Sequence, residues 1–198
     1  MIRHLTAIAG LLLLTACVGG GNSAAQRYSL TPQGSASSCT AGSSLKVLEP
    51  SPAPGLDTAR MVVVDAPHHR THYRGVGWTT TAPRLVQYYL ADSLDRSGLF
   101  AHVMTDDSVI PSDYQLELEL QEFQVDLTTG TPRVMIRLDA TLLRSSNYQP
   151  LRTMPLQREV SAAGQDLQGI VAIFNEQMHS ITQELFDRMG SAIPACRR

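Results

Sequence analysis

The stretch Tyr114-Gln-Leu-Glu-Leu-Glu-Leu-Gln-Glu-Phe-Gln-Val-Asp-Leu127 decides the fold class, because apolar and polar residues alternate along it. A period of two residues predicts a β-strand with one buried face. The apolar residues take even positions up to Leu120, whereas those after Glu122 take odd positions. We therefore expect a β-bulge near Gln121 and Glu122, because one extra residue keeps both apolar sets on the core side.

Further strands are predicted on both sides of this stretch. Val134–Leu142 alternates cleanly, and Met154–Ala162 alternates apart from Arg158. Upstream, Ala59–Asp65 contains a continuous apolar run, which predicts a strand buried on both faces. Shorter segments that also predict strands are Arg27–Leu30, Leu45–Leu48 and Phe100–Met104.

Two amphipathic helices complete the predicted domain. The first follows Thr80 and Thr81, whose hydroxyls suit an N-cap, has Pro83 in its first turn and ends at Gly98. The second covers about Asp166–Ser191 and has an apolar stripe at three- and four-residue spacing. Together these elements predict a single layered α/β domain, with a mixed, mostly antiparallel sheet packed against two helices.

The N-terminus has the parts of a lipoprotein signal peptide. A basic start precedes the apolar core Leu5–Leu14, which is too short to span a bilayer, and Leu14-Thr-Ala-Cys17 forms a lipobox. We therefore expect residues 1–16 to be removed and Cys17 to be lipidated. Several acyl chains on one cysteine hold a protein firmly on a membrane without a transmembrane helix.

The mature chain is predicted to be a tether followed by one folded domain. Residues 17–26 are rich in small and polar residues and predict a flexible tether, while 27–193 is long enough for one domain. Loss of Arg3 from the 16 basic residues leaves 15 against 18 acidic ones, a net charge of −3 with His neutral. No nucleic-acid footprint is present. No Asp follows Cys17 directly, which matches the outer-membrane sorting pattern of enterobacteria.

Cys39 and Cys196 lie near the two ends of the predicted domain. An oxidising periplasm permits a disulfide. A bridge that closes so large a loop stabilises a protein by on the order of 4 to 5 kcal/mol. We predict a bridge between them, with two free thiols on loose ends as the alternative.

Catalytic and cofactor motifs are not found in the sequence. It contains no Gly-x-Ser-x-Gly, His-Glu-x-x-His, Cys-x-x-Cys or phosphate-binding glycine loop, so we predict neither an enzyme nor a cofactor. His68, His69 and His72, with Asp65 nearby, have a spacing that suits zinc or copper. Two arginines in the same segment oppose a cation, so we predict no metal site.

The segment from Ala66 to Gly77 has no apolar period and predicts a long loop. Long irregular loops in compact domains are usually functional or disordered, and aromatic residues are enriched at interfaces. The segment therefore predicts a partner interface, with local packing as the alternative for each aromatic residue. The candidate interface residues are His68, His69, His72, Tyr73 and Trp78.

Three segments, in this order along the chain, resemble the ABC-type transport auxiliary lipoproteins. They are Leu56-Asp-Thr-Ala-Arg-Met-Val-Val-Val64, the segment that runs to Trp78, and the helix end Leu94-Asp-Arg-Ser-Gly-Leu-Phe100. The opening Tyr28-Ser-Leu30 and the lipobox fit as well, and the likeness covers residues 27 to 190 in outline. It departs at the Ser/Gly-rich stretch around Cys39 and at the His-rich segment.

The resemblance implies a non-enzymatic partner of an ABC transporter that works with mammalian-cell-entry (MCE) proteins. Such systems move phospholipid or other hydrophobic cargo between inner and outer membranes, and the ATPase and permease are other chains. The lipoprotein is expected at the outer membrane, where it meets the MCE conduit, in at least one case as a homo-oligomeric ring. The resemblance supplies no site residue beyond the lipidated Cys17. The alternatives are a structural or assembly lipoprotein of the envelope, and a periplasmic ligand-binding lipoprotein with a deep apolar pocket.

Overall fold

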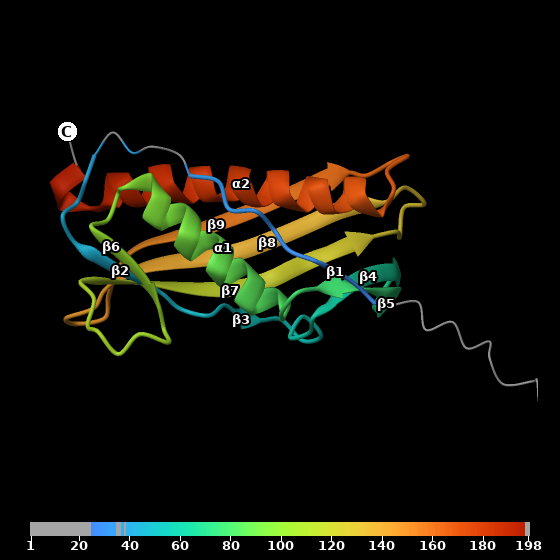
Figure 1. Cartoon of the computed structure of the whole chain (residues 1–198), viewed down its shortest axis with the longest axis horizontal. Coiled ribbons are helices and arrows are strands. Elements are labelled where there is room, and N and C mark those ends of the chain that lie inside the picture. The colour runs from blue at the N-terminus through green and yellow to red at the C-terminus, as the bar shows by residue number, and fades with distance from the viewer. Residues whose placement is uncertain (1–24, 35–36, 38, 197–198) are drawn as a thin grey trace, which may run out of the picture.

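The computed structural model of the chain describes residues 25–34, 37 and 39–196. These form one domain in which two helices cover one face of a nine-stranded mixed sheet (Figure 1), which confirms the predicted layered α/β fold. In chain order the elements are β1 (Gln26–Tyr28), β2 (Ser44–Val47), β3 (Ser51–Pro52), β4 (Arg60–Ala66), β5 (His69–Trp78), α1 (Ala82–Ser97), β6 (His102–Thr105), β7 (Tyr114–Asp126), β8 (Arg133–Arg144), β9 (Gln149–Ser161), α2 (Leu167–Ala192) and the 3₁₀ turn η1 (Pro194–Cys196).

The long strand β7 organises the sheet. On one side it pairs along its whole length with antiparallel β8, which in turn pairs with antiparallel β9. On the other side three short strands pair with it in parallel, β2 at its start, β3 in its middle and β4 at its end. Beyond these, β6 pairs with β2, and β5 and then β1 extend the sheet from β4.

The predicted bulge lies in β7. The pairing of β7 with β8 shifts between Leu120 and Glu122, so that one extra residue is accommodated there. Leu120 before the shift and Phe123 after it are both buried. The bulge therefore keeps the two apolar sets of different parity on the same side of the sheet.

The core lies between the sheet and the helices, and Trp78 is at its aromatic centre. The ring centroid of Trp78 lies 5.3 Å from that of Phe123 on β7 and 5.2 Å from that of Phe174 on α2. Phe123 and Phe174 are themselves 4.8 Å apart. The triad links the strand, the helix and the end of β5, because each ring touches the other two in the tilted or edge-on arrangements that aromatic pairs favour.

The helix ends follow the sequence signals closely. α1 has Thr81 at its N-cap position and ends at Gly98, whose φ of 69° is the left-handed conformation that glycine adopts without strain. The hydroxyl of Thr81 makes no capping hydrogen bond, so the fixed φ of Pro83 in the first turn is the stronger start signal. α2 begins after Asp166, whose Oδ1 accepts a hydrogen bond from the backbone N–H of Gly169 at 2.8 Å.

The prediction of a long loop between Ala66 and Gly77 is wrong. Strands β4 and β5 form a hairpin there, and Pro67 and His68 make the two-residue turn between them. His68 has a φ of 65°, which together with the preceding proline is the pattern of a type II turn. The pairing of β4 with β5 contains two register shifts, and these break the alternation that identifies a strand.

The predicted signal peptide, the lipobox and Cys17 lie outside the described residues. Gln26, the last residue of the predicted tether, is already the first residue of β1. No helix in the described part of the chain is both long and apolar enough to cross a bilayer.

Candidate functional site

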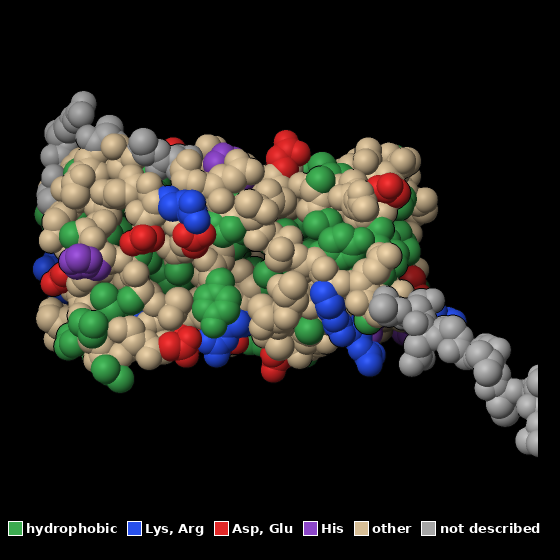
Figure 2. All heavy atoms as spheres, in the orientation of Figure 1, with side chains coloured by type: hydrophobic (Ala, Val, Ile, Leu, Met, Phe, Trp, Pro, Cys, Tyr) green, Lys and Arg blue, Asp and Glu red, His purple; other side chains and the backbone are tan. Residues whose placement is uncertain are grey.

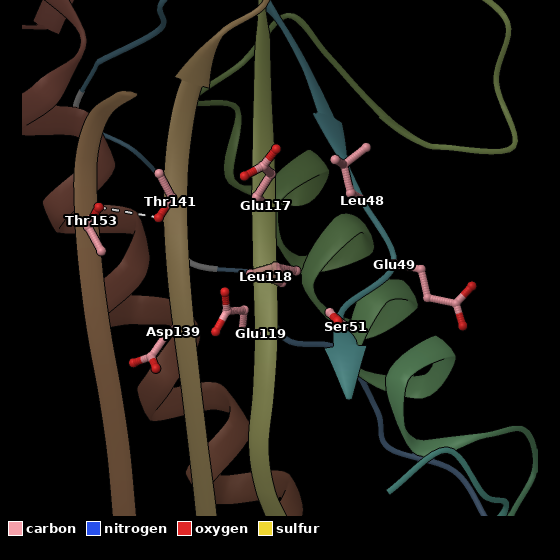
Figure 3. A pocket seen from close by; sticks show the side chains of 9 residues that line it. All are labelled: Leu48, Glu49, Ser51, Glu117, Leu118, Glu119, Asp139, Thr141 and Thr153. Carbon is pink, nitrogen blue, oxygen red and sulfur yellow. Dashed lines mark hydrogen bonds between the residues drawn. The ribbon is translucent and has the colours of Figure 1, made fainter. Parts of the chain in front are cut away.

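A groove of about 500 Å³ lies on the face of the sheet that the helices leave uncovered (Figure 3). Four segments of the chain contribute to it: the stretch from the end of β2 into β3, the first half of β7, and the parts of β8 and β9 that lie beside it. The groove is lined by Leu48, Glu49, Ser51, Glu117, Leu118, Glu119, Asp139, Thr141 and Thr153. We call it the acidic groove, because four of these side chains are carboxylates.

Two of the carboxylates oppose each other directly. Glu119 on β7 and Asp139 on β8 are cross-strand partners in the antiparallel pairing. Like charges in that position destabilise a sheet. Gln121 donates a hydrogen bond to Glu119 at 3.1 Å, but within the described residues neither carboxylate has a basic ion-pair partner. The groove therefore has an uncompensated negative charge that a basic group on another molecule would neutralise.

The rim of the groove is fixed by contacts to α1. Arg84 forms ion pairs with Glu49 and with Asp107, both at 3.0 Å between nitrogen and oxygen. Gln87, fully buried on the same helix, donates hydrogen bonds to the carbonyl of Val47 at 3.0 Å and to Asp106 at 2.7 Å. These contacts hold the β2–β3 turn and the segment after β6 against the helix.

Asp106 is ionised in this setting. Burial alone would raise its pKa, but hydrogen bonds from the Gln87 amide and from the backbone N–H of Glu49 outweigh it and hold the pKa below its ordinary value. The negative charge beside the groove rim is therefore maintained to lower pH than that of an ordinary aspartate.

The acidic groove offers negative charge and hydroxyl groups to whatever lies in it. Its polar groups are carboxylates and hydroxyls, and the hydroxyls of Thr141 and Thr153 lie 3.3 Å from each other. Among the residues that the structure describes, no group of three or more His, Cys, Asp or Glu side chains has an arrangement that would hold a metal ion. The lining instead suits an extended cationic segment.

The long edge strand β9 is poorly suited to pairing with another strand. Pro150 and Pro155 lie within it, and a proline has no backbone N–H to donate to a neighbouring strand. The carbonyl of Pro155 also accepts a hydrogen bond from Arg188 of α2 at 3.4 Å. A partner is therefore better received on the open face of the sheet than at this edge.

A second surface feature lies at one end of the domain. Val109 and Ile110, in the segment between β6 and β7, are 96% and 61% exposed, and Tyr148 in the β8–β9 turn is 68% exposed. The two segments are joined, because the backbone N–H of Ser145 donates to the carbonyl of Asp113 at 2.9 Å. We call Val109, Ile110 and Tyr148 the apolar tip. It lies at the opposite end of the domain from β1, where the described chain begins (Figure 1).

The residues predicted to form a partner interface are separated by the structure. His68 and His69 are exposed at the β4–β5 hairpin, whereas His72 and Tyr73 are partly buried along β5. Trp78 is 1% exposed in the aromatic core, so its assignment to a surface is wrong. The alternative of local packing applies to it, because its ring fills the space between β7 and α2.

His69 has a carboxylate partner within its own hairpin. Its Nδ1 lies 2.5 Å from Oδ1 of Asp65. The hydrogen bond with His69 lowers the pKa of the Asp65 carboxyl. The pair stabilises the hairpin end on an exposed surface, where such contacts contribute little.

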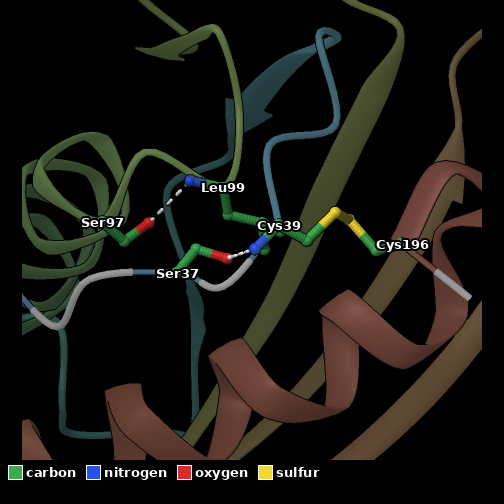
Figure 4. Close-up of a disulfide and its surroundings, with 5 residues drawn as sticks. All are labelled: Ser37, Cys39, Ser97, Leu99 and Cys196. Atoms are coloured by element: carbon green, nitrogen blue, oxygen red, sulfur yellow. Dashed lines mark hydrogen bonds between the residues drawn. A yellow bond between two sulfur atoms is a disulfide. The ribbon is translucent and has the colours of Figure 1, made fainter. Parts of the chain in front are cut away.

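Cys39 and Cys196 form a disulfide in the structure, with their Cα atoms 5.7 Å apart (Figure 4). The bridge connects the segment before β2 to η1 at the end of α2. The same segment is held beside α1, because Ser37 and Ala41 donate backbone hydrogen bonds to Ser97 at 2.9 Å and to Leu99 at 2.7 Å. The disulfide thus links the two helix ends through the chain that precedes β2.

The acidic groove was not predicted from the sequence. A partial signal exists, because the alternation in Tyr114–Leu120 places Glu117 and Glu119 together on the exposed side. Asp139 occupies an equivalent exposed position in the next strand, but the register that brings it opposite Glu119 is visible only in the fold.

Comparison with known proteins assigns the chain to a family. The family model of the ABC-type transport auxiliary lipoprotein component matches residues 28–185. The chain belongs to this family. Membership makes it an auxiliary lipoprotein of an ABC transport system and points to the cell envelope, and the family is not one of known enzymes. None of the curated proteins matches the chain.

Several solved structures share the fold of this chain. A Xanthomonas campestris protein of the family model DUF330 is 25% identical, with a TM-score of 0.75 over 83% of this chain and 94% of that chain. An uncharacterized protein shares the fold at 14% identity, with a TM-score of 0.64 over 82% of this chain and 97% of that chain. A hypothetical protein from Chlamydia trachomatis does so at 8% identity, with a TM-score of 0.54 over 77% and 98%.

Proposed function

We propose that this auxiliary lipoprotein is anchored in the outer membrane through Cys17 and acts as an adaptor of an MCE-type ABC transport system. The system would move phospholipid or other hydrophobic cargo between the inner and outer membranes, with the ATPase, permease and MCE protein as separate chains. The match of the family model to residues 28–185 carries the proposal. The lipobox at Leu14–Cys17 supports the anchoring step.

The acidic groove is the proposed docking site for the MCE protein. Its unpaired carboxylates Glu119 and Asp139 favour a basic segment, since charge complementarity steers association and selects partners. Prolines in β9 discourage strand addition, so the partner is expected to lie across β7 and β8. A second copy of this chain is an additional candidate partner, because auxiliary subunits of such systems are expected to form homo-oligomers.

Cargo is expected to pass through the partner rather than bind inside this domain. Pockets for hydrophobic ligands are concave and lined mostly by apolar side chains. The acidic groove is open and has carboxylates and hydroxyls in its lining, and a hollow of about 430 Å³ beside β1 is lined by arginines. Neither fits an acyl chain, which disfavours the ligand-binding alternative.

Phospholipid traffic distinguishes the adaptor from a purely structural lipoprotein. In cells that lack this protein, a pulse of labelled phospholipid should move between the two membranes at a changed rate, and the wild-type chain should restore the rate. A Cys17→Ser chain, which cannot be lipidated, should fail to restore it although it is exported. If the deletion weakens the envelope while phospholipid exchange keeps its normal rate, the structural alternative replaces the proposal.

A further inference from the structure

Three arginines on adjacent strands surround a second groove, at the end of the sheet where the described chain begins. Arg27 on β1 and Arg60 on β4 are both in register with Gly77 on β5. Arg74, also on β5, completes the set. The groove has a volume of about 430 Å³, and we call it the arginine groove. Its lining residues are Ala25, Arg27, Arg60, Thr71, His72, Tyr73, Arg74, Gly75 and Val76.

Gly77 makes the geometry of this groove possible. A Cβ atom at this position would lie 2.3 Å from Nη1 of Arg27 and 2.3 Å from the carbonyl oxygen of Ala59. The missing side chain lets the Arg27 guanidinium lie across β5, where it donates to the Ala59 carbonyl at 3.4 Å. The next residue, Trp78, points into the core, so by strand alternation Gly77 and its two arginine partners lie on the face away from the helices.

The groove carries an unbalanced positive charge. Within the described part of the chain, none of Arg27, Arg60 and Arg74 forms an ion pair, whereas five other arginines do: Arg84, Arg96, Arg133, Arg158 and Arg188. Residues 25–28 and 57–79 contain four arginines and two aspartates, whereas the mature chain as a whole has a net charge of −3. This end of the domain is therefore basic, although the chain as a whole is acidic.

The position of the groove relative to the proposed lipid anchor is the decisive observation. Ala25, the first described residue, lines the groove itself. Eight residue steps separate it from Cys17, a distance of at most about 29 Å even for a fully extended chain. In the space-filling view basic side chains lie beside the start of the described chain (Figure 2). Lipidation at Cys17 would keep this end of the domain near the bilayer surface.

We infer that the arginine groove binds the anionic phosphate headgroups of the bilayer in which Cys17 is anchored. Guanidinium groups present planar pairs of donors that match phosphate oxygens, and they bind phosphate more specifically than a lysine does. The contact fixes the orientation of the domain, because it holds the β4–β5 end on the membrane and directs the apolar tip away from it. The inference rests on the lipidation proposed above, and it adds a second membrane contact to the anchor.

Vesicle binding of the unlipidated protein isolates this second contact. The full mature chain, residues 17–198 with Cys17→Ser, is sedimented with vesicles of phosphatidylcholine alone and with vesicles of equal parts phosphatidylcholine and phosphatidylglycerol. We expect binding to the anionic vesicles only, and weaker binding at higher salt. The double variant Arg60→Gln, Arg74→Gln should bind about 30-fold more weakly, since each arginine near an anionic surface contributes roughly fivefold.

Two controls separate the groove from net charge and from misfolding. The double variant Arg137→Gln, Arg144→Gln removes the same charge from two exposed arginines outside the groove and should bind like the parent. The conservative variant Arg60→Lys, Arg74→Lys should keep most of the binding. Equal losses in both glutamine variants, or no preference of the parent for anionic vesicles, would overturn the inference.

The same variants show whether the arginine groove binds a membrane or another protein. If the Arg60→Gln, Arg74→Gln chain binds vesicles like the parent but loses self-association, the groove faces the acidic surface of a second copy and the inference fails. Lipidation of Cys17 is measured separately: mass spectrometry of the protein extracted from membranes shows whether it carries the mass of the acyl chains. A correct lipid mass without headgroup binding would therefore remove this inference and leave the proposed function intact.

Discussion

Glu119 and Asp139 face each other across β7 and β8 on the open side of the sheet, and no described basic side chain pairs with either. A like-charged cross-strand pair costs stability in the isolated domain, and a basic group on a partner would relieve that cost. This relationship is the structural basis of the proposed docking site.

Removing one charge of this pair should stabilise the isolated domain. We expect Glu119→Gln to raise the free energy of unfolding by about 0.5 kcal/mol, since the cross-strand repulsion is relieved while the side chain keeps its shape. Urea denaturation provides the measurement. Glu176→Gln, on the exposed face of α2, is the matched control and should change stability by less. A loss of stability in Glu119→Gln would show that this carboxylate has a stabilising partner.

Loss of the disulfide should weaken the domain strongly. Cys39 and Cys196 are 157 residues apart in the sequence, and closure of so long a loop constrains the unfolded chain by up to about 5 kcal/mol. The Cys39→Ser, Cys196→Ser double variant should therefore unfold at lower urea concentration than the oxidised parent. Addition of reductant should shift the parent to the midpoint of the variant and leave the variant unchanged. Two alkylatable thiols in the native periplasmic protein would contradict the bridge.

Trp78 should be a structural residue and not a partner contact. Truncation to alanine leaves a cavity between Phe123 and Phe174, which for a buried aromatic residue costs about 3 to 5 kcal/mol. Urea denaturation followed by circular dichroism measures this loss in the Trp78→Ala chain. In the parent the fluorescence of Trp78, the only tryptophan, can follow unfolding as well. Tyr148→Ala, at the exposed apolar tip, serves as the comparison and should leave the midpoint of unfolding unchanged. Partner binding that fails in a fully folded Trp78→Phe chain would argue against the core assignment.

Asp113 should contribute an acid-sensitive part of the stability. The backbone N–H and the hydroxyl of Ser44 each donate to Oδ2 of Asp113 at 2.8 Å, and these bonds lower its pKa below the ordinary 3.8. A group with a lowered folded pKa stabilises the protein above its unfolded pKa, and the contribution is lost as the pH falls through the folded value. Asp113→Asn should therefore be less stable than the parent at pH 7, and the difference should shrink below pH 3.8. A difference that grows on acidification would contradict the assignment.

The predictable parts of this fold are those encoded over a few neighbouring residues. The change in the parity of apolar positions around Gln121 predicted the bulge in β7. Gly98 marked the end of α1 and Asp166 marked the start of α2. Periodicity and capping are local properties of the sequence, so all three features could be predicted. Strand β5 was not predicted, because it lacks such a local pattern. Its register shifts against β4 remove the local alternation, and only pairing with its neighbours shows that it is a strand.

The candidate site was harder to predict, since it depends on register between distant segments. Glu119 and Asp139 were each recognisable as exposed, but their opposition is set by the β7–β8 pairing. The arginine groove likewise needs Arg27 and Arg60 to meet on either side of Gly77, although they are 33 positions apart. Trp78 was assigned to a surface because the sequence does not show which of the residues flanking a polar segment turns into the core.

Site-specific crosslinking in the cell tests the adaptor most directly. A photoreactive amino acid in place of Thr141, in the acidic groove, should capture the MCE protein of the same transport system, whereas one in place of Glu176 on the helix-covered side should not. Glu119→Lys, which reverses the charge beside it, should remove the Thr141 product without changing the amount of folded protein. Absence of an MCE product from Thr141, or equal products from both positions, would contradict docking in the acidic groove.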